Sequence, residues 1–277
     1  MSIRVVLQRC EDLFGIQVLT PLAQAAGAHV FLASRAGKEV VLKIGVNERE
    51  ISREVRALMS FSSRAAILII NYDESLRAVL QERAVPGHPL SAILDDAYAT
   101  EIFCSVFQRL QPAAITGTHE LIQDHVSAID RYHRASNGTG PLPKAWVDRS
   151  LDYLYGLIAS TDRPVLLHGD LHHGNILYHR GDWVVIDPKG IIGDRHFEPI
   201  QYLLNYPRCG GDAGVVLARR MTMLTERLAL DGQRIARWGV VKGLLDACWA
   251  LEEGKDWQGG IENAERFERW LTDFGHS

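Results

Sequence analysis

Short apolar segments bounded by turn residues characterise the first third of the chain. Residues 29–34 (HVFLAS) and 38–45 (KEVVLKIG) flank the sequence Arg-Ala-Gly, which predicts a β-hairpin. Residues 66–71 (AILIIN) and 76–81 (LRAVLQ) flank the turn sequence Tyr-Asp-Glu-Ser in the same way. We therefore expect a small antiparallel sheet in this part of the chain.

One helix is predicted between the two pairs of strands. Asn47 is a good N-cap residue, and Glu50 follows three positions later, as in a capping box. Apolar residues then recur at helical spacing, at Ile51, Val55 and Leu58. The first third of the chain is therefore predicted to be a small sheet with one main helix packed against it.

Breaker residues separate this sheet from a mainly helical remainder. Residues 82–90 (ERAVPGHPL) contain two prolines and a glycine, which interrupt any regular element. We expect an α+β protein with a β-rich lobe at 1–85, a hinge near 82–87 and a larger, mostly helical lobe at 86–277. Within the larger lobe the patterns predict helices at 98–110, 121–134 and 144–159, short strands at 165–168, 176–178 and 183–186, and helices from Phe197 onward.

The composition is that of an ordinary globular protein, with 277 residues of which 47% are hydrophobic and 23% charged. The formal net charge is −4 and no basic cluster is present, so we expect no nucleic-acid partner. The longest strongly apolar run, residues 66–70, is too short to span a bilayer, and the N-terminal segment is a poor signal peptide. We expect a monomeric, cytoplasmic protein with no membrane partner.

The four cysteines are scattered along the chain and form no CxxC pair. This distribution predicts buried thiols in a reducing compartment rather than disulfides or a zinc site. The residues concerned are Cys10, Cys104, Cys209 and Cys248.

Residues 166–190 (LLHGDLHHGNILYHRGDWVVIDPKG) concentrate the candidate chemistry. They hold four of the eleven histidines of the chain, and His168, Asp170, His172 and His173 are close enough in sequence to suggest a zinc site. However, no short zinc spacing such as HExxH is present, and adjacent histidines in a tight loop usually point in different directions. The spacing of the aspartates and the asparagine supports a different interpretation.

Phosphoryl transfer of the kinase type explains that spacing. It uses an aspartate that accepts the hydroxyl proton, an asparagine five positions later that binds Mg²⁺, and a second metal-binding aspartate after a short hairpin. Asp170, Asn175 and Asp187 occur in this order, with Asp187 at the end of the apolar strand WVVID. Oxygen ligands suit the hard Mg²⁺ ions that bridge ATP phosphates. We therefore expect Mg²⁺ and ATP as cofactors.

A phosphate clamp upstream completes the kinase set. Lys43 lies in an apolar strand, where an unpaired charge is costly. Glu54, eleven residues later on the predicted helix, is the expected partner, while Glu50 competes for that role but suits a capping role better. Alone, Lys43 would be read as an edge lysine that reaches solvent. Together with the downstream aspartates, it is read as the lysine that orients the α- and β-phosphates.

The glycine-rich loop of protein kinases is missing before Lys43. The candidate phosphate-covering loop, AQAAGAHVF, has a single glycine, and the backbone amides of Gly27 and Ala28 are the candidates to face the phosphates. The backbone from Glu82 to Ala84 is the candidate adenine hinge. The same segment would also serve as an ordinary linker between lobes.

With these residues assembled, the chain resembles the aminoglycoside phosphotransferases, and within them the streptomycin 6-phosphotransferase and hydroxyurea phosphotransferase branch. The resemblance is carried by HGDLHHGNIL, by WVVIDPKGIIGDRHFEPIQYLLN and by CWALEEG at 248–254, and is strongest over 165–205. It implies a bilobal protein-kinase-like fold and transfer from Mg-ATP to a small hydroxyl-bearing acceptor.

The resemblance also implies roles for individual residues. Asp170 would be the base, Asn175 and Asp187 the metal ligands, and Lys43 with Glu54 the phosphate clamp. An acidic residue after the metal aspartate supports the catalytic loop in related enzymes, and Glu198 would take that place here. His168 would pack beneath the catalytic loop. Lys189 belongs to the branch pattern and would either steady phosphate charge or pair with an acidic neighbour.

Candidate acceptor-binding residues follow from the chemistry of a cationic aminocyclitol. Streptomycin carries two guanidinium groups, which carboxylates bind in a directional, bidentate way. Asp246, Trp249 and Glu253 recur at helical spacing, with Glu252 beside them and His172 as a further candidate near the base. The alternative is a solvated acidic helix end with a tryptophan in the core.

The sequence therefore favours an ATP-dependent O-phosphotransferase acting on streptomycin, an antibiotic-resistance activity. A second interpretation keeps the kinase but changes the acceptor to hydroxyurea, a sugar or a metabolic alcohol. A third interpretation is a non-catalytic nucleotide-binding module, which would not need Asp170.

Overall fold

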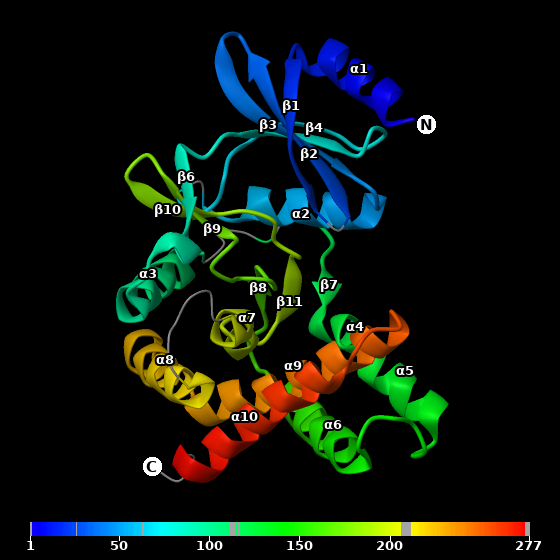
Figure 1. The fold of residues 1–277 in the computed structure, drawn as a ribbon, viewed down its shortest axis with the longest axis vertical. Coiled ribbons are helices and arrows are strands. Elements are labelled where there is room, and N and C mark those ends of the chain that lie inside the picture. Colours follow the sequence, from blue (N-terminus) through cyan, green and yellow to red (C-terminus); the bar gives the residue numbers. More distant parts are fainter. Residues whose placement is uncertain are drawn as a thin grey trace. The chain divides into compact units, whose positions relative to one another are not determined.

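A computed structural model describes residues 2–25, 27–62, 64–110, 115, 117–205 and 212–274 (Figure 1). The chain forms two compact units that are discontinuous along the sequence. The first unit comprises Met1–Ala92, Val106–His119 and Gly174–Gly190, and the second comprises Ile93–Ser105, Glu120–His173 and Ile191–Ser277. The sequence analysis placed one boundary at residue 85; the structure instead returns residues 174–190 to the first unit, because they form a hairpin that pairs there.

The first unit contains a five-stranded antiparallel sheet with the order β1-β2-β3-β5-β4. Both predicted hairpins are present, although the second turn occupies 74–77 rather than 72–75 because its first strand runs on to Asp73. The strands are β1 (Gln17–Ala25), β2 (Ala28–Arg35), β3 (Lys38–Gly45), β4 (Ile69–Asp73) and β5 (Ala78–Glu82).

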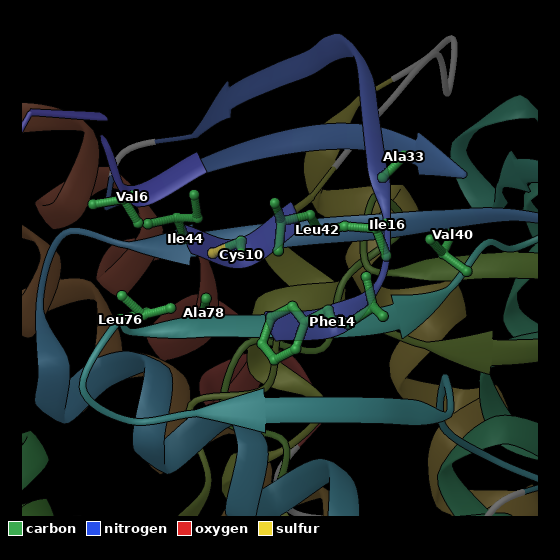
Figure 2. Packing of buried hydrophobic residues seen from close by; sticks show 11 residues of the cluster. Val6, Cys10, Phe14, Ile16, Ala33, Val40, Leu42, Ile44, Leu76 and Ala78 are labelled. Atoms are coloured by element: carbon green, nitrogen blue, oxygen red, sulfur yellow. The ribbon is translucent and has the colours of Figure 1, made fainter. Parts of the chain in front are cut away.

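Two helices cover opposite faces of this sheet (Figure 1). Successive side chains of a strand point to opposite faces, so Leu42 and its alternate neighbours in β3 pack under α1 (Ile3–Phe14), a helix that the sequence analysis did not anticipate. Figure 2 shows this core, in which Phe14 and Cys10 of α1 lie against the strands. The predicted helix, α2 (Glu48–Ser60), packs on the other face, and the Asn47 side chain caps it by accepting from Arg49 N at 2.9 Å.

A second, three-stranded sheet in the first unit has the order β10-β9-β6. It contains β9 (Ile176–His179) and β10 (Asp182–Val185), which are the predicted hairpin strands, and β6 (Pro86–Pro89). The expectation that residues 82–90 hold no regular element was therefore wrong. Proline is tolerated in β6 because it is an edge strand, where the missing N–H breaks no ladder. The short 3₁₀ helix η1 (Leu90–Ala92) follows it.

The second unit is mainly helical. Its small sheet has the order β7-β11-β8. The long helix α9 is buried along most of its length, and Gly243 of α9 and Gly260 of α10 allow the two helices to touch, since a Cβ on either glycine would lie 2.6 Å from the other's carbonyl oxygen. The elements are α3 (Asp96–Arg109, shared between the units), β7 (Glu120–Leu121), α4 (Ile122–His125), α5 (Ser127–Ser136), α6 (Lys144–Ala159), β8 (Val165–Leu167), β11 (Ile191–Gly193), η2 (Arg195–Phe197), α7 (Ile200–Leu204), α8 (Ala213–Leu228), α9 (Gly232–Glu252) and α10 (Gln258–Phe274).

The helix predicted at 121–134 is interrupted in the structure. Leu121 pairs with Ile192 of β11, and the chain then forms α4 and α5 with a break at Val126. The Ser127 hydroxyl donates to Asp124 O at 2.6 Å, and Ile129 N donates to Val126 O, so local bonds replace the regular helical ladder. The prediction of one continuous helix was wrong because apolar periodicity does not register such side-chain competition.

The described cysteines are buried thiols, as predicted: Cys10, Cys104 and Cys248. The fourth, Cys209, lies outside the described residues. Within the described ranges, no helix is long and apolar enough to cross a membrane.

Candidate active site

An ion cluster in the first unit joins three of the predicted site residues. Lys43 Nζ lies 2.7 Å from Glu54 Oε2 and 2.8 Å from Asp187 Oδ1. The side chains of Lys43 and Glu54 are each 9% exposed, whereas that of Asp187 is 38% exposed. One buried ammonium group therefore links the sheet, α2 and the segment that follows β10.

Strand alternation explains why Lys43 reaches this partner. Lys43 pairs with Val79 across β3 and β5, and Val79 packs against α2, so the lysine also leaves the sheet on the α2 face. Gln81, two residues along β5, donates to Glu54 Oε1 at 3.4 Å. Gly45 lets α2 approach, since a Cβ there would lie 2.8 Å from Ile51 Cβ. The sequence analysis did not identify Gln81, whose only signal was its place on the same face.

Burial and neighbouring charges control the ionisation of this cluster. Burial raises the pKa of Glu54 to about 7, with Lys43 acting to lower it and Asp187 to raise it. Burial acts to lower the pKa of Lys43, but the two carboxylates outweigh that effect and raise it above its usual range. Lys43 is therefore charged, and both carboxylates compete for its charge.

Asn175 and Asp187 flank the β9–β10 hairpin, both at its open end. Ile186 N donates to Asn175 O at 3.0 Å, which closes the open end of the hairpin next to both residues. Asp187 has φ 59°, a conformation that is costly for a residue other than glycine and concentrates at functional sites. The amide and carboxylate oxygens of this pair are of the type that Mg²⁺ accepts, with phosphate oxygens and water completing the shell.

No group of three or more histidine, cysteine, aspartate or glutamate side chains in the described part of the chain is arranged to hold a metal ion. The histidines of residues 166–190 have other contacts instead. His179 contacts Glu82 in the first unit, and His173 stacks on Tyr202 in the second. A pair of oxygen ligands that shares a metal with phosphates would not need such a group.

The candidate catalytic loop around Asp170 lies in the second unit and is held by Glu198. Glu198 Oε2 accepts from His168 N at 2.6 Å, and Glu198 Oε1 accepts from Gly169 N at 3.0 Å. Asp170 N donates to His168 Nδ1 at 3.3 Å, and His168 is completely buried. Gly169 has φ 80°, which allows the chain to turn sharply just before Asp170.

The ionisation of Glu198 reflects two opposing influences. Burial raises its pKa to about 7, while the N–H groups of Gly169 and His168 favour the charged form. Asp170 raises the pKa as well. Because both carboxylate oxygens accept N–H bonds, the ionised form is the one that this geometry fits.

His172 and His173 point to different surroundings. His172 Nε2 lies 4.0 Å from Asp170 Oδ1, and its side chain is partly exposed. His173 is 2% exposed and stacks on Tyr202 with ring centroids 4.2 Å apart. Burial, and then Arg220, lowers the pKa of His173 to about 3, so this imidazole is neutral.

A buried ion pair supports the stack beneath His173. Arg220 is fully buried, donates to Asp96 Oδ1 at 2.5 Å and to Asn205 O at 2.7 Å, and lies over the Tyr202 ring at 4.7 Å. The sequence analysis did not identify Arg220. No local pattern distinguishes a buried arginine from the many exposed ones.

The candidate nucleotide-contacting residues lie in the first unit. Gly27 has φ 109° and its carbonyl accepts from Val46 N at 2.8 Å, while Ala28 begins β2 and is buried. The Glu82 side chain is engaged within the unit, where its Oε1 accepts from Leu68 N at 3.2 Å. Ala84 is half-buried and follows the end of β5.

The candidate acceptor residues on α9 have partners within the chain. Lys242 Nζ donates to Asp246 Oδ1 at 2.5 Å and lies 5.4 Å from the Trp249 ring centroid. Arg131 Nη2 contacts Glu252 Oε1 at 2.8 Å, and Lys255 contacts Glu253 Oε2 at 2.5 Å. The structure does not gather these carboxylates into one unpaired acidic cluster. The sequence analysis missed Arg131 because it is 121 positions from Glu252, and Lys255 because it follows the helix. Lys242 is four positions before Asp246 on α9, so its spacing was a signal that the sequence analysis overlooked.

Comparison with known proteins places these findings in context. A family model for aminoglycoside/hydroxyurea antibiotic resistance kinases matches residues 18–254. The chain is 28% identical over 253 residues to the hydroxyurea phosphotransferase of Kitasatospora aureofaciens, covering 87% of this chain and 71% of that protein. It is also 28% identical over 230 residues to the streptomycin 6-kinase of Streptomyces griseus, covering 79% of this chain and 73% of that protein.

Solved structures share the fold. A thermostable mutant of aminoglycoside phosphotransferase APH(4)-Ia, in ternary complex with ADP and hygromycin B, gives a TM-score of 0.70 at 17% identity and covers 98% of this chain and 99% of that chain. The choline kinase LicA from Streptococcus pneumoniae gives a TM-score of 0.68 at 14% identity, with 98% and 99% covered. The expected protein-kinase-like fold is confirmed.

Proposed function

Because the chain belongs to the aminoglycoside/hydroxyurea antibiotic resistance kinase family, we propose that it transfers the γ-phosphoryl group of ATP to a hydroxyl of streptomycin in a Mg²⁺-dependent reaction. Phosphotransfer to a small antibiotic-like acceptor follows from the family itself. ATP, the metal ion and the acceptor are the finer part of the proposal. We place the reaction in the cytoplasm, where ATP is supplied.

The observation that carries this proposal is the ion cluster of Lys43, Glu54 and Asp187, with N–O distances of 2.7 and 2.8 Å. It matches the arrangement that a phosphoryl-transfer enzyme needs, because a cation fixed by Glu54 can orient the phosphates next to a metal-binding carboxylate. A buried lysine with a purely structural role would need only one carboxylate partner. The second partner here, Asp187, is partly exposed and has a strained backbone conformation.

In this proposal each residue has a defined task. Asp170 accepts the proton of the acceptor hydroxyl as the new O–P bond forms, and Glu198 holds its loop through the His168 and Gly169 amides. Asn175 and Asp187 would hold Mg²⁺, which when bound neutralises charge on the phosphate oxygens. The α- and β-phosphates would replace Asp187 as partners of Lys43, which would then orient them.

A second acceptor is favoured by a specific observation. The carboxylates of Asp246, Glu252 and Glu253 each contact a basic side chain of this chain, so a dicationic acceptor must compete with those partners. A small uncharged acceptor such as hydroxyurea has no such competition. Streptomycin binding would therefore displace Lys242 or Arg131, whereas hydroxyurea phosphorylation would leave both pairs in place.

The test is ADP release with Mg-ATP, measured by a coupled assay across streptomycin, other aminoglycosides, hydroxyurea and sugars. Streptomycin-dependent turnover that is lost in Asp170→Ala, with nucleotide binding retained, supports the proposal. Turnover with hydroxyurea alone selects the second acceptor. Intact ATP binding without turnover on any acceptor would refute the streptomycin proposal and support a nucleotide-binding module.

A further inference from the structure

His179 occupies a joint between the end of β9 and residues 82–87, the hinge segment. It is 8% exposed, and both of its ring nitrogens have partners from that segment. Val85 N lies 3.1 Å from His179 Nδ1, and Glu82 Oε2 lies 3.3 Å from His179 Nε2. All three residues belong to the first unit.

These contacts fix the tautomer of the ring. A backbone N–H can only donate, so Nδ1 must be the acceptor from Val85. The single proton of the neutral ring is therefore on Nε2, where it is donated to the Glu82 carboxylate. The opposite tautomer would set two N–H groups against each other at Val85 and leave Glu82 without a donor from the ring.

Backbone bonds surround this joint and hold the same segments. Arg180 N donates to Val85 O at 2.9 Å, and Pro86 of β6 is paired with His179. The other oxygen of the Glu82 carboxylate accepts from Leu68 N, the residue before β4, at 3.2 Å. The imidazole is thus a side-chain link between the end of β5, the hinge segment and β9, and Arg180, whose Nη1 lies 3.6 Å from the same Glu82 oxygen, is a second, more exposed one.

β9 connects this joint directly to the candidate metal ligands. Asn175 immediately precedes β9, His179 is its last residue, and Asp187 follows its partner strand β10. Four residues of extended chain place the two ends of β9 roughly 10 Å apart. A strand that is paired on both sides is a stiff spacer, so fixing its hinge end also fixes the position of Asn175 along the same line.

We propose that His179 is a positioning residue for the nucleotide. Its contacts hold the hinge segment against β9 and so set the distance between the backbone that contacts adenine and the Mg²⁺ ligands. The inference rests on the proposed function, because it assumes that the hinge segment contacts adenine. It adds a residue to that function that touches neither nucleotide nor metal. A ligand that binds both the hinge segment and the Mg²⁺ ligands therefore depends on the His179 contacts, whereas a ligand that binds only the hinge segment does not.

Two variants separate the contacts of the ring. His179→Phe removes both nitrogens and leaves Val85 N–H and the Glu82 carboxylate without this partner. His179→Asn keeps an acceptor near the place of Nδ1 for Val85 but cannot reach Glu82. His88→Phe is the matched control, since His88 is an exposed histidine on β6, one residue after the hinge segment.

The experiment measures dissociation constants by calorimetry for Mg-AMP-PNP and for adenosine, using the full chain. We expect His179→Phe to weaken Mg-AMP-PNP binding about tenfold, which corresponds to about 1.4 kcal/mol, and adenosine binding less than about threefold. His179→Asn should recover part of the lost Mg-AMP-PNP affinity. His88→Phe should bind both ligands like the unmodified protein.

The outcomes separate this inference from the proposed function. Equal weakening of both ligands by His179→Phe, or no weakening of either, overturns the inference while the kinase function stands. Failure of the unmodified protein to bind Mg-AMP-PNP overturns both. If His179→Phe does not fold, as judged by its thermal transition, Glu82→Gln takes its place, because one amide oxygen cannot serve both Leu68 N–H and the His179 proton; it should show the same selective loss for Mg-AMP-PNP.

Discussion

Replacement of Lys43 by methionine tests the electrostatics of the ion cluster without requiring an acceptor. The substitution keeps the aliphatic chain but leaves Glu54, whose side chain is 9% exposed, without its cation. Removing one partner of a buried ion pair costs about 3–5 kcal/mol. Asp187 is 38% exposed and is stabilised by water, so its share is small and we expect a loss near the lower figure, about 3 kcal/mol at pH 7.

The pH dependence of that loss is the sharper part of the prediction. The pKa of Glu54 is about 7 in the native protein against 4.5 for an ordinary glutamate, and Lys43 acts to lower it. Without Lys43 the native pKa rises further, so above pH 7 the folded variant holds a proton that the folded parent and both unfolded chains have released. Each pH unit in this range therefore destabilises the variant by about 1.4 kcal/mol more, relative to the parent.

The assay is urea unfolding of both proteins at pH 7.0, 7.75 and 8.5, in EDTA and without nucleotide. The difference in unfolding free energy between parent and Lys43→Met should grow with pH. In Lys43→Met/Glu54→Gln the growth should vanish, because the glutamine carries no titrating group. A difference that stays constant or shrinks between pH 7.0 and 8.5 would show that Glu54 is not the group that Lys43 holds in its charged form.

The remaining predictions concern the candidate catalytic loop, the buried ion pair of Arg220 and Asp96, and the proposed metal ligands. Glu198→Gln should lower kcat at least about tenfold, because an amide accepts at one oxygen only. In the parent protein the rate should rise with pH through about 7 as Glu198 ionises, and this rise should be absent from the pH–rate profile of the variant. Arg220→Met should reduce the free energy of unfolding by about 3 kcal/mol in urea melts, and Asp96→Asn added to it should restore part of the loss, because Asp96 is then no longer a buried charge. Excess EDTA should abolish ADP release and added Mg²⁺ should restore it, whereas Asp187→Asn should need a higher Mg²⁺ concentration for half-maximal rate; unchanged turnover in EDTA would contradict the metal's role.

The sequence predicted the elements whose signals are local. The two hairpins of the first sheet, the capped helix α2 and the helix at 144–159 were identified because turn residues, the Asn47 cap and apolar spacing are contained within a few residues. β6 was missed for the opposite reason, because it depends on β9 as a pairing partner about ninety residues away. The break at Val126 was missed because apolar periodicity does not register the side-chain bond from Ser127 to Asp124 O.

The amino-acid sequence by itself determined the reaction chemistry that this chain can support. The order and spacing of Lys43, Glu54, Asp170, Asn175 and Asp187 indicated phosphoryl transfer, because those intervals follow from a strand, a helix and a hairpin whose local patterns are readable. The residue types also fixed which atoms can accept a proton or bind a hard cation.

Only the tertiary structure decided which charges meet. It paired Glu54 and Asp187 with one lysine, gave Asp246, Glu252 and Glu253 basic partners of their own, buried Arg220 against Asp96, and connected His179 to the hinge segment. These contacts join residues up to 144 positions apart. Their energies depend on burial and on distances of a few ångströms, and neither quantity is encoded by any short window of the chain.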